Sequence, residues 1–284
     1  MSLDPRFTLD ALPDPRFRAA VRAMDAGDLP ALEGVLAEHP ELPGTRVTYG
    51  DGYFRDPYLL WFVAENPIRN GVLPPNADAV AAAIVHAARR AGTADLQPQL
   101  DYALGLVCSG RVPRECGVQD ALVDVLVAEG ARPDAAMLSA LAHRERAAVE
   151  RLLARGATLS LAVATATHRV DHARRLAPGA GAAERRLALA AAALHGDAEM
   201  LALLLPLVDP ADASAYAPDG FHSHATPLHQ AVDAGSLAAV RALVAAGADT
   251  SARDRLYDAT PLEWAVFLER DEVAQWLRAA IPRA

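Results

Sequence analysis

One apolar spacing recurs along this chain. Val240, Leu243 and Val244 stand seven, four and three positions before Gly247. The same offsets describe five further triplets: Val149/Leu152/Leu153, Val123/Leu126/Val127, Leu32/Val35/Leu36, Leu201/Leu204/Leu205 and Val273/Trp276/Leu277. This spacing places three side chains on one face of an α-helix. A short helix cannot bury such a face alone, so the recurrence predicts a stack of helical repeats.

A second set of short helices is expected between these. Its members are predicted at 16–26, 57–65, 99–107, 135–142, 159–166 and 185–195, and after Thr226-Pro227 and Thr260-Pro261. The two sets together predict an all-α solenoid of about eight helix pairs, filling residues 1–284 as a single elongated domain. The composition agrees, because a chain with many alanines and only 5% aromatic residues favours closely packed helices over a sheet.

The most regular copy of the unit lies within 219–280. Thr226-Pro227-Leu228-His229-Gln230-Ala231-Val232, Gly235 and Gly247-Ala248-Asp249 resemble the pattern of ankyrin repeats. Thr260-Pro261 restarts that motif 34 residues after Thr226, close to the family period of about 33 residues. The resemblance implies an ankyrin-like helical-repeat solenoid with a few β-hairpin fingers, in which His229 ties one repeat to its neighbour by hydrogen bonds.

The same resemblance implies a function. Ankyrin arrays bind other proteins on a concave face lined by the fingers and the first helices, so a non-catalytic protein–protein interaction scaffold is expected. All 27 basic residues are arginine, which we interpret as the codon bias of a GC-rich, bacterial genome. The chain is therefore expected to be a divergent bacterial member of the family.

The middle of the chain departs from the family pattern. Successive second helices end at Gly130, Gly156, Gly179 and Val208, so the steps are 26, 23 and 29 residues. These steps leave room for helices and tight turns only, which predicts lost or reduced fingers between 130 and 190. In the irregular pair at 159–179, His172 and Arg175 stand at positions that are apolar elsewhere. With His168 and Arg169 they motivate an alternative function: small-molecule or metal binding, possibly enzymatic.

Several function classes are not expected. A net charge of −9 argues against a nucleic-acid partner. No apolar run could span a membrane, and residues 1–20 show no signal peptide, so a monomeric cytoplasmic protein is expected. Cys108 and Cys116 are too sparse for a disulfide framework or a zinc site. The chain has no lysine for a phosphate-binding loop and no nucleophile elbow, so neither catalysis nor a cofactor is expected.

Three long connections carry the candidate partner-binding residues. These are the aromatic loop at 40–57, the loop at 206–225 and the finger at 248–260. Aromatic and charged side chains in predicted fingers are typical of interaction surfaces. The candidates are Tyr49, Asp51, Tyr53, Phe54, Arg55, Phe221, His222, His224, Arg253, Arg255 and Tyr257. His222 and His224 alternate along the chain, which leaves a metal contact open as an alternative to solvated finger-tip histidines.

Overall fold

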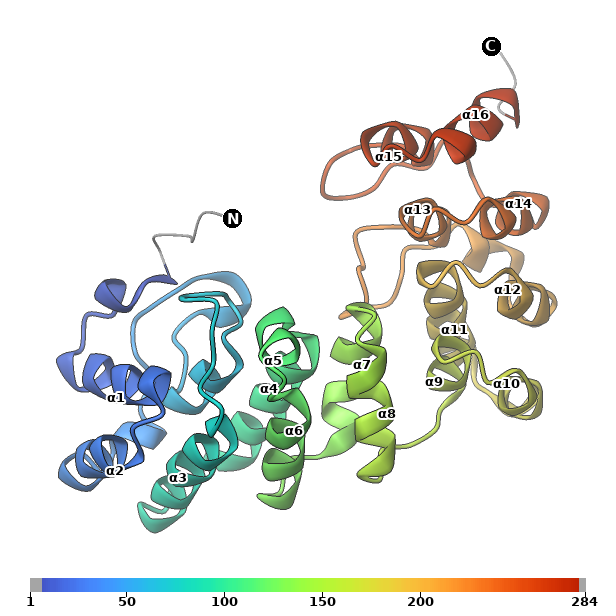
Figure 1. The fold of residues 1–284 in the computed structure, drawn as a ribbon. Coiled ribbons are helices and arrows are strands. Elements are labelled where there is room, and N and C mark those ends of the chain that lie inside the picture. Colours follow the sequence, from blue (N-terminus) through green and yellow to red (C-terminus); the bar gives the residue numbers. More distant parts are fainter. Residues whose placement is uncertain (1–6, 281–284) are drawn as a thin grey trace. The chain divides into compact units, whose positions relative to one another are not determined.

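The computed structural model describes residues 7–280, whose regular elements are all helices, with no β-strand among them (Figure 1). The chain divides into two compact units, Met1–Thr158 and Leu159–Ala284. Each unit is a stack of helix pairs with its own apolar interior. The all-α repeat fold is thereby confirmed, while its extent as a single elongated domain stays a prediction.

The N-terminal unit contains four layers. Its helices are α1 Pro15–Ala26, α2 Leu29–Glu38, α3 Ala77–Arg90, α4 Leu96–Ser109, α5 Arg111–Glu115, α6 Gln119–Ala128, α7 Pro133–Ala142 and α8 Arg146–Ala154. The pairs are α1 with α2, a 3-10 helix at Leu59–Ala64 with α3, α4 with α6, and α7 with α8. The second layer therefore begins with a 3-10 helix where an α-helix is expected.

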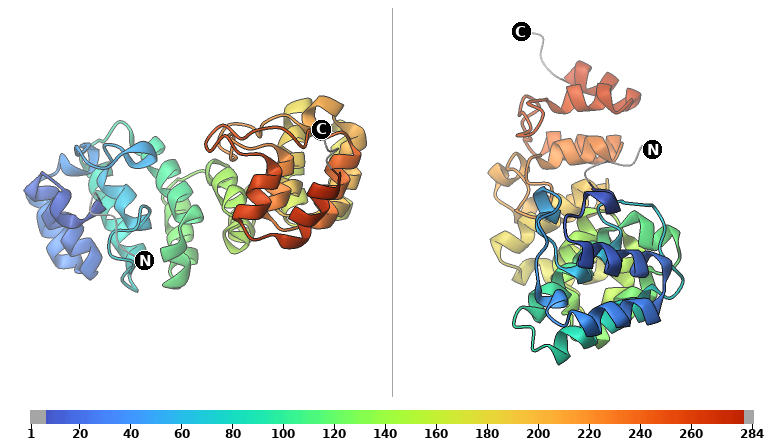
Figure 2. Two further views of the ribbon diagram at one scale, coloured as in Figure 1. Left: turned by 90° about the horizontal axis from the view of Figure 1, so that it is seen from above. Right: turned by 90° about the vertical axis from the view of Figure 1, so that its left-hand side faces the viewer.

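The C-terminal unit contains four further layers. Its helices are α9 Leu161–Ala166, α10 Val170–Leu176, α11 Ala182–Leu194, α12 Ala198–Leu204, α13 Pro227–Asp233, α14 Leu237–Ala245, α15 Pro261–Phe267 and α16 Asp271–Ala280. The first helices α9, α11, α13 and α15 pack in that order, and α12, α14 and α16 pack beside them. Figure 2 shows α13–α14 and α15–α16, in orange and red, as successive layers. Eight layers in the described residues agree with the sequence-based expectation.

Local signals explain where these short helices begin and end. Thr260 caps α15: its hydroxyl accepts the Glu263 N–H at 3.3 Å, and the Glu263 carboxylate accepts the Thr260 N–H at 2.7 Å. Gly235 follows α13 with φ +70°, a left-handed conformation that glycine adopts without strain. The repeated stripe is buried as expected, with Val240 and Leu243 fully shielded from solvent. Burial of this stripe against the neighbouring layers holds each helix in place.

The β-hairpin fingers are not confirmed. In the loop after α14 one cross-loop backbone bond forms, from the Asp254 N–H to the Ala259 carbonyl at 2.9 Å. The Asp254 side chain accepts the N–H groups of the loop tip, so these are not available for a strand ladder. Residues 129–132 and 155–160 are short connections, in agreement with the expected loss of fingers in the middle of the chain.

The aromatic loop at 40–57 belongs to the interior of the N-terminal unit. Tyr49 is only 5% exposed and Phe54 1%, so the interpretation of these two rings as solvent-facing contacts is wrong. Their rings pack edge to face with centroids 6.3 Å apart, and both contact Phe62 of the 3-10 helix. The physical reason is the short 3-10 helix, which leaves an apolar space that these rings fill.

Candidate functional site

A cavity of about 610 Å³ opens in the C-terminal unit, between its first helices and its two long loops. Helices α11, α13 and α15 form one side, and the loops before α13 and before α15 form the other. The lining side chains are mostly apolar or aromatic. They are Leu194, His222, His224, Ala225, Gln230, Asp233, Tyr257, Ala259, Glu263, Trp264, Phe267 and Leu268.

The helical side of the cavity repeats one register. Leu194, Asp233 and Phe267 each stand two residues before the left-handed turn that ends their layer's first helix, at Gly196, Gly235 and Glu269 respectively. Gln230 and Trp264 share a second register, five residues before Gly235 and Glu269. Equivalent positions of stacked repeats lie in a row, so the stacking itself brings these side chains together.

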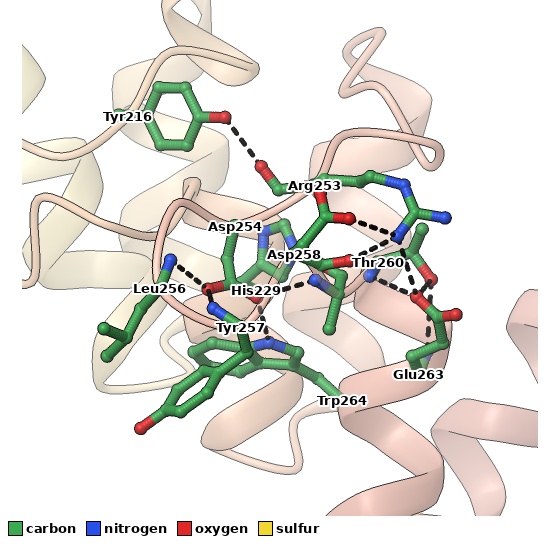
Figure 3. Close-up of polar contacts among 11 residues, drawn as sticks. Tyr216, His229, Arg253, Asp254, Leu256, Tyr257, Asp258, Thr260, Glu263 and Trp264 are labelled. Atoms are coloured by element: carbon green, nitrogen blue, oxygen red, sulfur yellow. Dashed lines mark hydrogen bonds and ion pairs between the residues drawn. The ribbon is translucent and has the colours of Figure 1, made fainter.

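Asp254 organises the loop side of the cavity (Figure 3). One carboxylate oxygen accepts the N–H groups of Leu256 at 2.8 Å and Tyr257 at 2.7 Å. The other accepts the Ala259 N–H at 3.1 Å and the Trp264 Nε1–H at 2.9 Å. Despite desolvation by burial, these donors lower the pKa of Asp254 to about 2. One buried carboxylate thereby fixes the loop tip and the Trp264 indole of α15 in the same place.

His229 joins the two layers beneath the cavity. Its Nε2 lies 3.0 Å from the Ala259 carbonyl and its Nδ1 lies 2.8 Å from the Thr226 hydroxyl. With Nε2–H donating to the carbonyl, Nδ1 is the acceptor, which is the neutral tautomer. Burial lowers the pKa of this fully shielded imidazole. The expected structural role of His229 agrees with this geometry.

The neutral state of His229 predicts acid sensitivity of the C-terminal unit. Because burial holds the folded-state pKa of His229 below the ordinary 6.5, the unfolded chain takes up this proton more readily than the folded chain as the pH falls. Stability is therefore expected to decrease from pH 7 to pH 5 in thermal melts. His229→Gln should have a lower melting temperature at pH 7 than the original chain. Its melting temperature should also decrease less between pH 7 and pH 5. His172→Gln, which replaces a histidine outside these contacts, is the control variant.

The mouth of the cavity exposes large apolar side chains. Phe267 is 84% exposed and Tyr257 69%, although both are aromatic. The His224 ring lies within 6.4 Å of the Tyr257 ring and 6.0 Å of the Trp264 ring, measured between centroids. Desolvation by burial lowers the pKa of His224, which favours its neutral form at pH 7. Phe267, Tyr257 and His224 thus form an exposed aromatic part of the cavity mouth, beside the carboxylates of Asp233 and Glu263.

One polar group of the cavity is unsatisfied. The Gln230 side chain is 2% exposed, and neither its amide oxygen nor its amide nitrogen has a hydrogen-bond partner among the described residues. A buried amide without partners costs free energy in the unbound protein. Such a group in a folded protein calls for an explanation, and a partner supplied by a bound molecule is one explanation.

The sequence-based candidates divide into three groups. His222, His224 and Tyr257 line the cavity. Arg253 and Arg255 are exposed on the same loop but lie outside the lining, and Arg255 stacks on Tyr216 at 3.8 Å. Phe221 is fully buried, so its assignment as a contact is wrong: it fills the interior of its loop. Asp51, Tyr53 and Arg55 are exposed in the N-terminal unit and do not contribute to the cavity.

Sequence reasoning missed the helical half of the cavity. Gln230, Trp264 and Phe267 lie on first helices, which were expected to line the binding face but contributed no candidate residue. The sequence did contain a signal for these residues, because an alignment of the first helices on the turns that end them shows the shared register. The residues that motivated small-molecule or metal binding in the irregular pair lie outside this cavity. Arg175 is exposed and does not occupy a core position, and the His168 Nδ1 lies 2.6 Å from the Asp197 carboxylate.

Within 7–280 no group of three or more His, Cys, Asp or Glu side chains is placed to hold a metal ion. Burial raises the pKa of the Cys108 thiol to about 12, which keeps it protonated. Across the same residues, every helix is too short or too polar to cross a lipid bilayer.

A comparison with protein-family models agrees with the repeat fold. The family described as ankyrin repeats (3 copies) matches residues 114–254 and 189–282, which together cover more than half of the 284 residues. The crystal structure of the human ASB11 ankyrin repeat domain is similar at 17% identity and a TM-score of 0.39, over 95% of this chain and 99% of that chain. A comparison with curated proteins gives no match. On the extent of the family match, this chain belongs to the ankyrin-repeat family.

Proposed function

We propose that this chain is a non-catalytic scaffold that binds another protein through the cavity face of its C-terminal unit. The cavity face consists of the loops before α13 and before α15 and of the first helices α11, α13 and α15. Ankyrin repeats are generally protein–protein interaction modules. The observation that carries the proposal is the apolar cavity of about 610 Å³ with exposed Tyr257 and Phe267 at its mouth.

The energetics of this face favour binding. Exposed aromatic side chains beside a preformed pocket are the usual centre of an interface, because they bury a large area at little cost in side-chain entropy. Phe267 packs little in the unbound chain, so its contribution is available to a partner. Asp254 and His229 hold the loop and α15 rigid, which reduces the ordering cost of association.

A peptide-display experiment tests the proposal. The purified full chain selects from a random peptide library, and the selected peptides are titrated against Phe267→Ser and against Val72→Ser. Val72 is the matched control, because it is also apolar and exposed, at 58%, but lies in the N-terminal unit. We expect Phe267→Ser to weaken binding by about 10-fold or more, the size of an interface hot spot, and Val72→Ser to leave it unchanged.

Two outcomes contradict the proposal. Peptides that bind both variants as tightly as the original chain do not use the cavity face. Self-association abolished by Phe267→Ser, seen by light scattering, would mean that the face is covered by a second copy of the chain, against the monomer that we propose.

A further inference from the structure

We infer that the cavity face takes up an arginine side chain from an extended segment of the partner. This inference rests on the proposed function and specifies the chemistry of its anchor. The first argument is charge: Asp233 and Glu263 are the charged residues in the lining, and no arginine is among the lining residues. A cation that enters the cavity therefore meets a lining whose charged side chains are both acidic.

The aromatic walls suit a planar cation. Trp264, Tyr257 and Phe267 all line the cavity, and Trp264 is held by its bond to Asp254. A guanidinium group stacks on such rings and is attracted to their faces, an interaction that is strongest with tryptophan and in desolvated sites. The aliphatic stem of an arginine at the same time covers the apolar side chains Leu194 and Leu268.

Gln230 is the reason to expect an arginine side chain in the cavity and not an aliphatic one. Its amide oxygen is an acceptor without a partner, and a guanidinium group carries five N–H donors in a fixed arrangement. A leucine or norleucine side chain would fill the cavity but leave this acceptor unsatisfied.

Two arginines of the chain lie close to the acidic walls and moderate their charge. Arg253 lies 3.9 Å from the Glu263 carboxylate, and Arg270 donates to the Asp233 backbone carbonyl at 2.9 Å. An arriving arginine competes with Arg253 for Glu263. Replacing Arg253 by Gln should therefore strengthen arginine binding, although the residue was first interpreted as a partner contact.

Three short peptides test the chemistry of the anchor. Acetyl-Gly-Arg-Gly-amide, its citrulline analogue and its norleucine analogue are titrated into the full chain, with tryptophan emission and NMR shifts as readouts. Citrulline keeps the shape and removes the charge, whereas norleucine keeps only the aliphatic stem. We expect the arginine peptide to bind about 10-fold more tightly than either analogue, the size of one desolvated cation–aromatic contact.

Two variants test the residues. Gln230→Met removes the unsatisfied amide at similar volume, so it should raise the melting temperature of the unbound chain and weaken the arginine peptide. Glu263→Gln keeps the cap of α15 but removes one negative charge, and should weaken the arginine peptide several-fold without affecting norleucine. Glu272→Gln on α16 is the control and should change nothing.

The outcomes distinguish this inference from the proposed function. Norleucine binding as tightly as arginine, or Gln230→Met and Glu263→Gln leaving the arginine peptide unchanged, overturns the arginine anchor. In that case the proposed function still holds if the library peptides bind Phe267→Ser more weakly than the original chain. If Phe267→Ser has no effect on any peptide, both are wrong.

Discussion

Arg69→Met is expected to lower the free energy of unfolding of the N-terminal unit by about 3–5 kcal/mol, the cost of breaking a buried ion pair. Arg69 is 5% exposed and donates to both oxygens of Asp25 on α1, at 2.8 and 2.9 Å. It also lies 2.8 Å from Glu65, which is 1% exposed. Without Arg69 the Glu65 carboxylate stays buried with no counter-charge.

Glu65 cannot simply turn to solvent. Its other carboxylate oxygen accepts the backbone N–H groups of Arg69, Asn70 and Gly71 at 2.8, 3.2 and 3.3 Å. The cluster thus ties residues 66–76, the loop that connects the 3-10 helix to α3, to α1 and to the end of the 3-10 helix. Removal of Arg69 leaves the Glu65 carboxylate buried without a counter-charge. The decrease in the free energy of unfolding should therefore be much larger than for an exposed ion pair.

Urea denaturation measures this effect. The control is Arg111→Met, which removes an exposed partner of Glu115 four residues along the chain and should change stability little. The double variant Glu65→Gln/Arg69→Met should recover part of the loss, because no charge remains buried. Equal effects of Arg69→Met and Arg111→Met would contradict the prediction.

Asp254→Asn is expected to lower the free energy of unfolding of the C-terminal unit by about 2–4 kcal/mol, since several charge-assisted hydrogen bonds weaken and buried donors lose their acceptor. The carboxylate takes four N–H groups, one of them from Trp264. Its amide replacement carries an NH₂ group on one side, which faces those donors. Loosening of Trp264 should also weaken the peptides selected by the cavity face.

The pH dependence of unfolding gives an independent readout of Asp254. The pKa of about 2 lies below the ordinary value of 3.8, so the contribution is complete above about pH 5 and is lost as the pH falls toward 2. Over that pH range the free energy of unfolding of the original chain should decrease by about 2 kcal/mol more than that of Asp254→Asn. Denaturation in urea at stepped pH measures the difference.

Asp258→Asn is the matched control for this experiment. Asp258 lies in the same loop, but its side chain is 85% exposed. The control should keep the stability and the pH profile of the original chain. An Asp254→Asn variant that behaves like the control would show that the four contacts contribute little to folding.

The repeat pattern by itself determined the fold class, because helix periodicity and caps are local properties. The offsets before Gly247 and the capping positions Thr226 and Thr260 follow from residues close in the sequence, whereas the interlayer role of His229 was implied by the resemblance to ankyrin repeats. A stack of about eight layers then follows, since each amphipathic helix needs a neighbour. The same local signals could not tell a 3-10 helix at Leu59–Ala64 from an α-helix.

Only the tertiary structure decided which aromatic side chains are available. Tyr49 and Tyr53 are four residues apart and equally aromatic, yet one is buried and the other 56% exposed. Burial depends on the space left by distant elements, which a local pattern does not contain. For the same reason Gln230, Trp264 and Phe267 converge on one cavity only when successive layers stack, because their proximity is a property of the array and not of any single repeat.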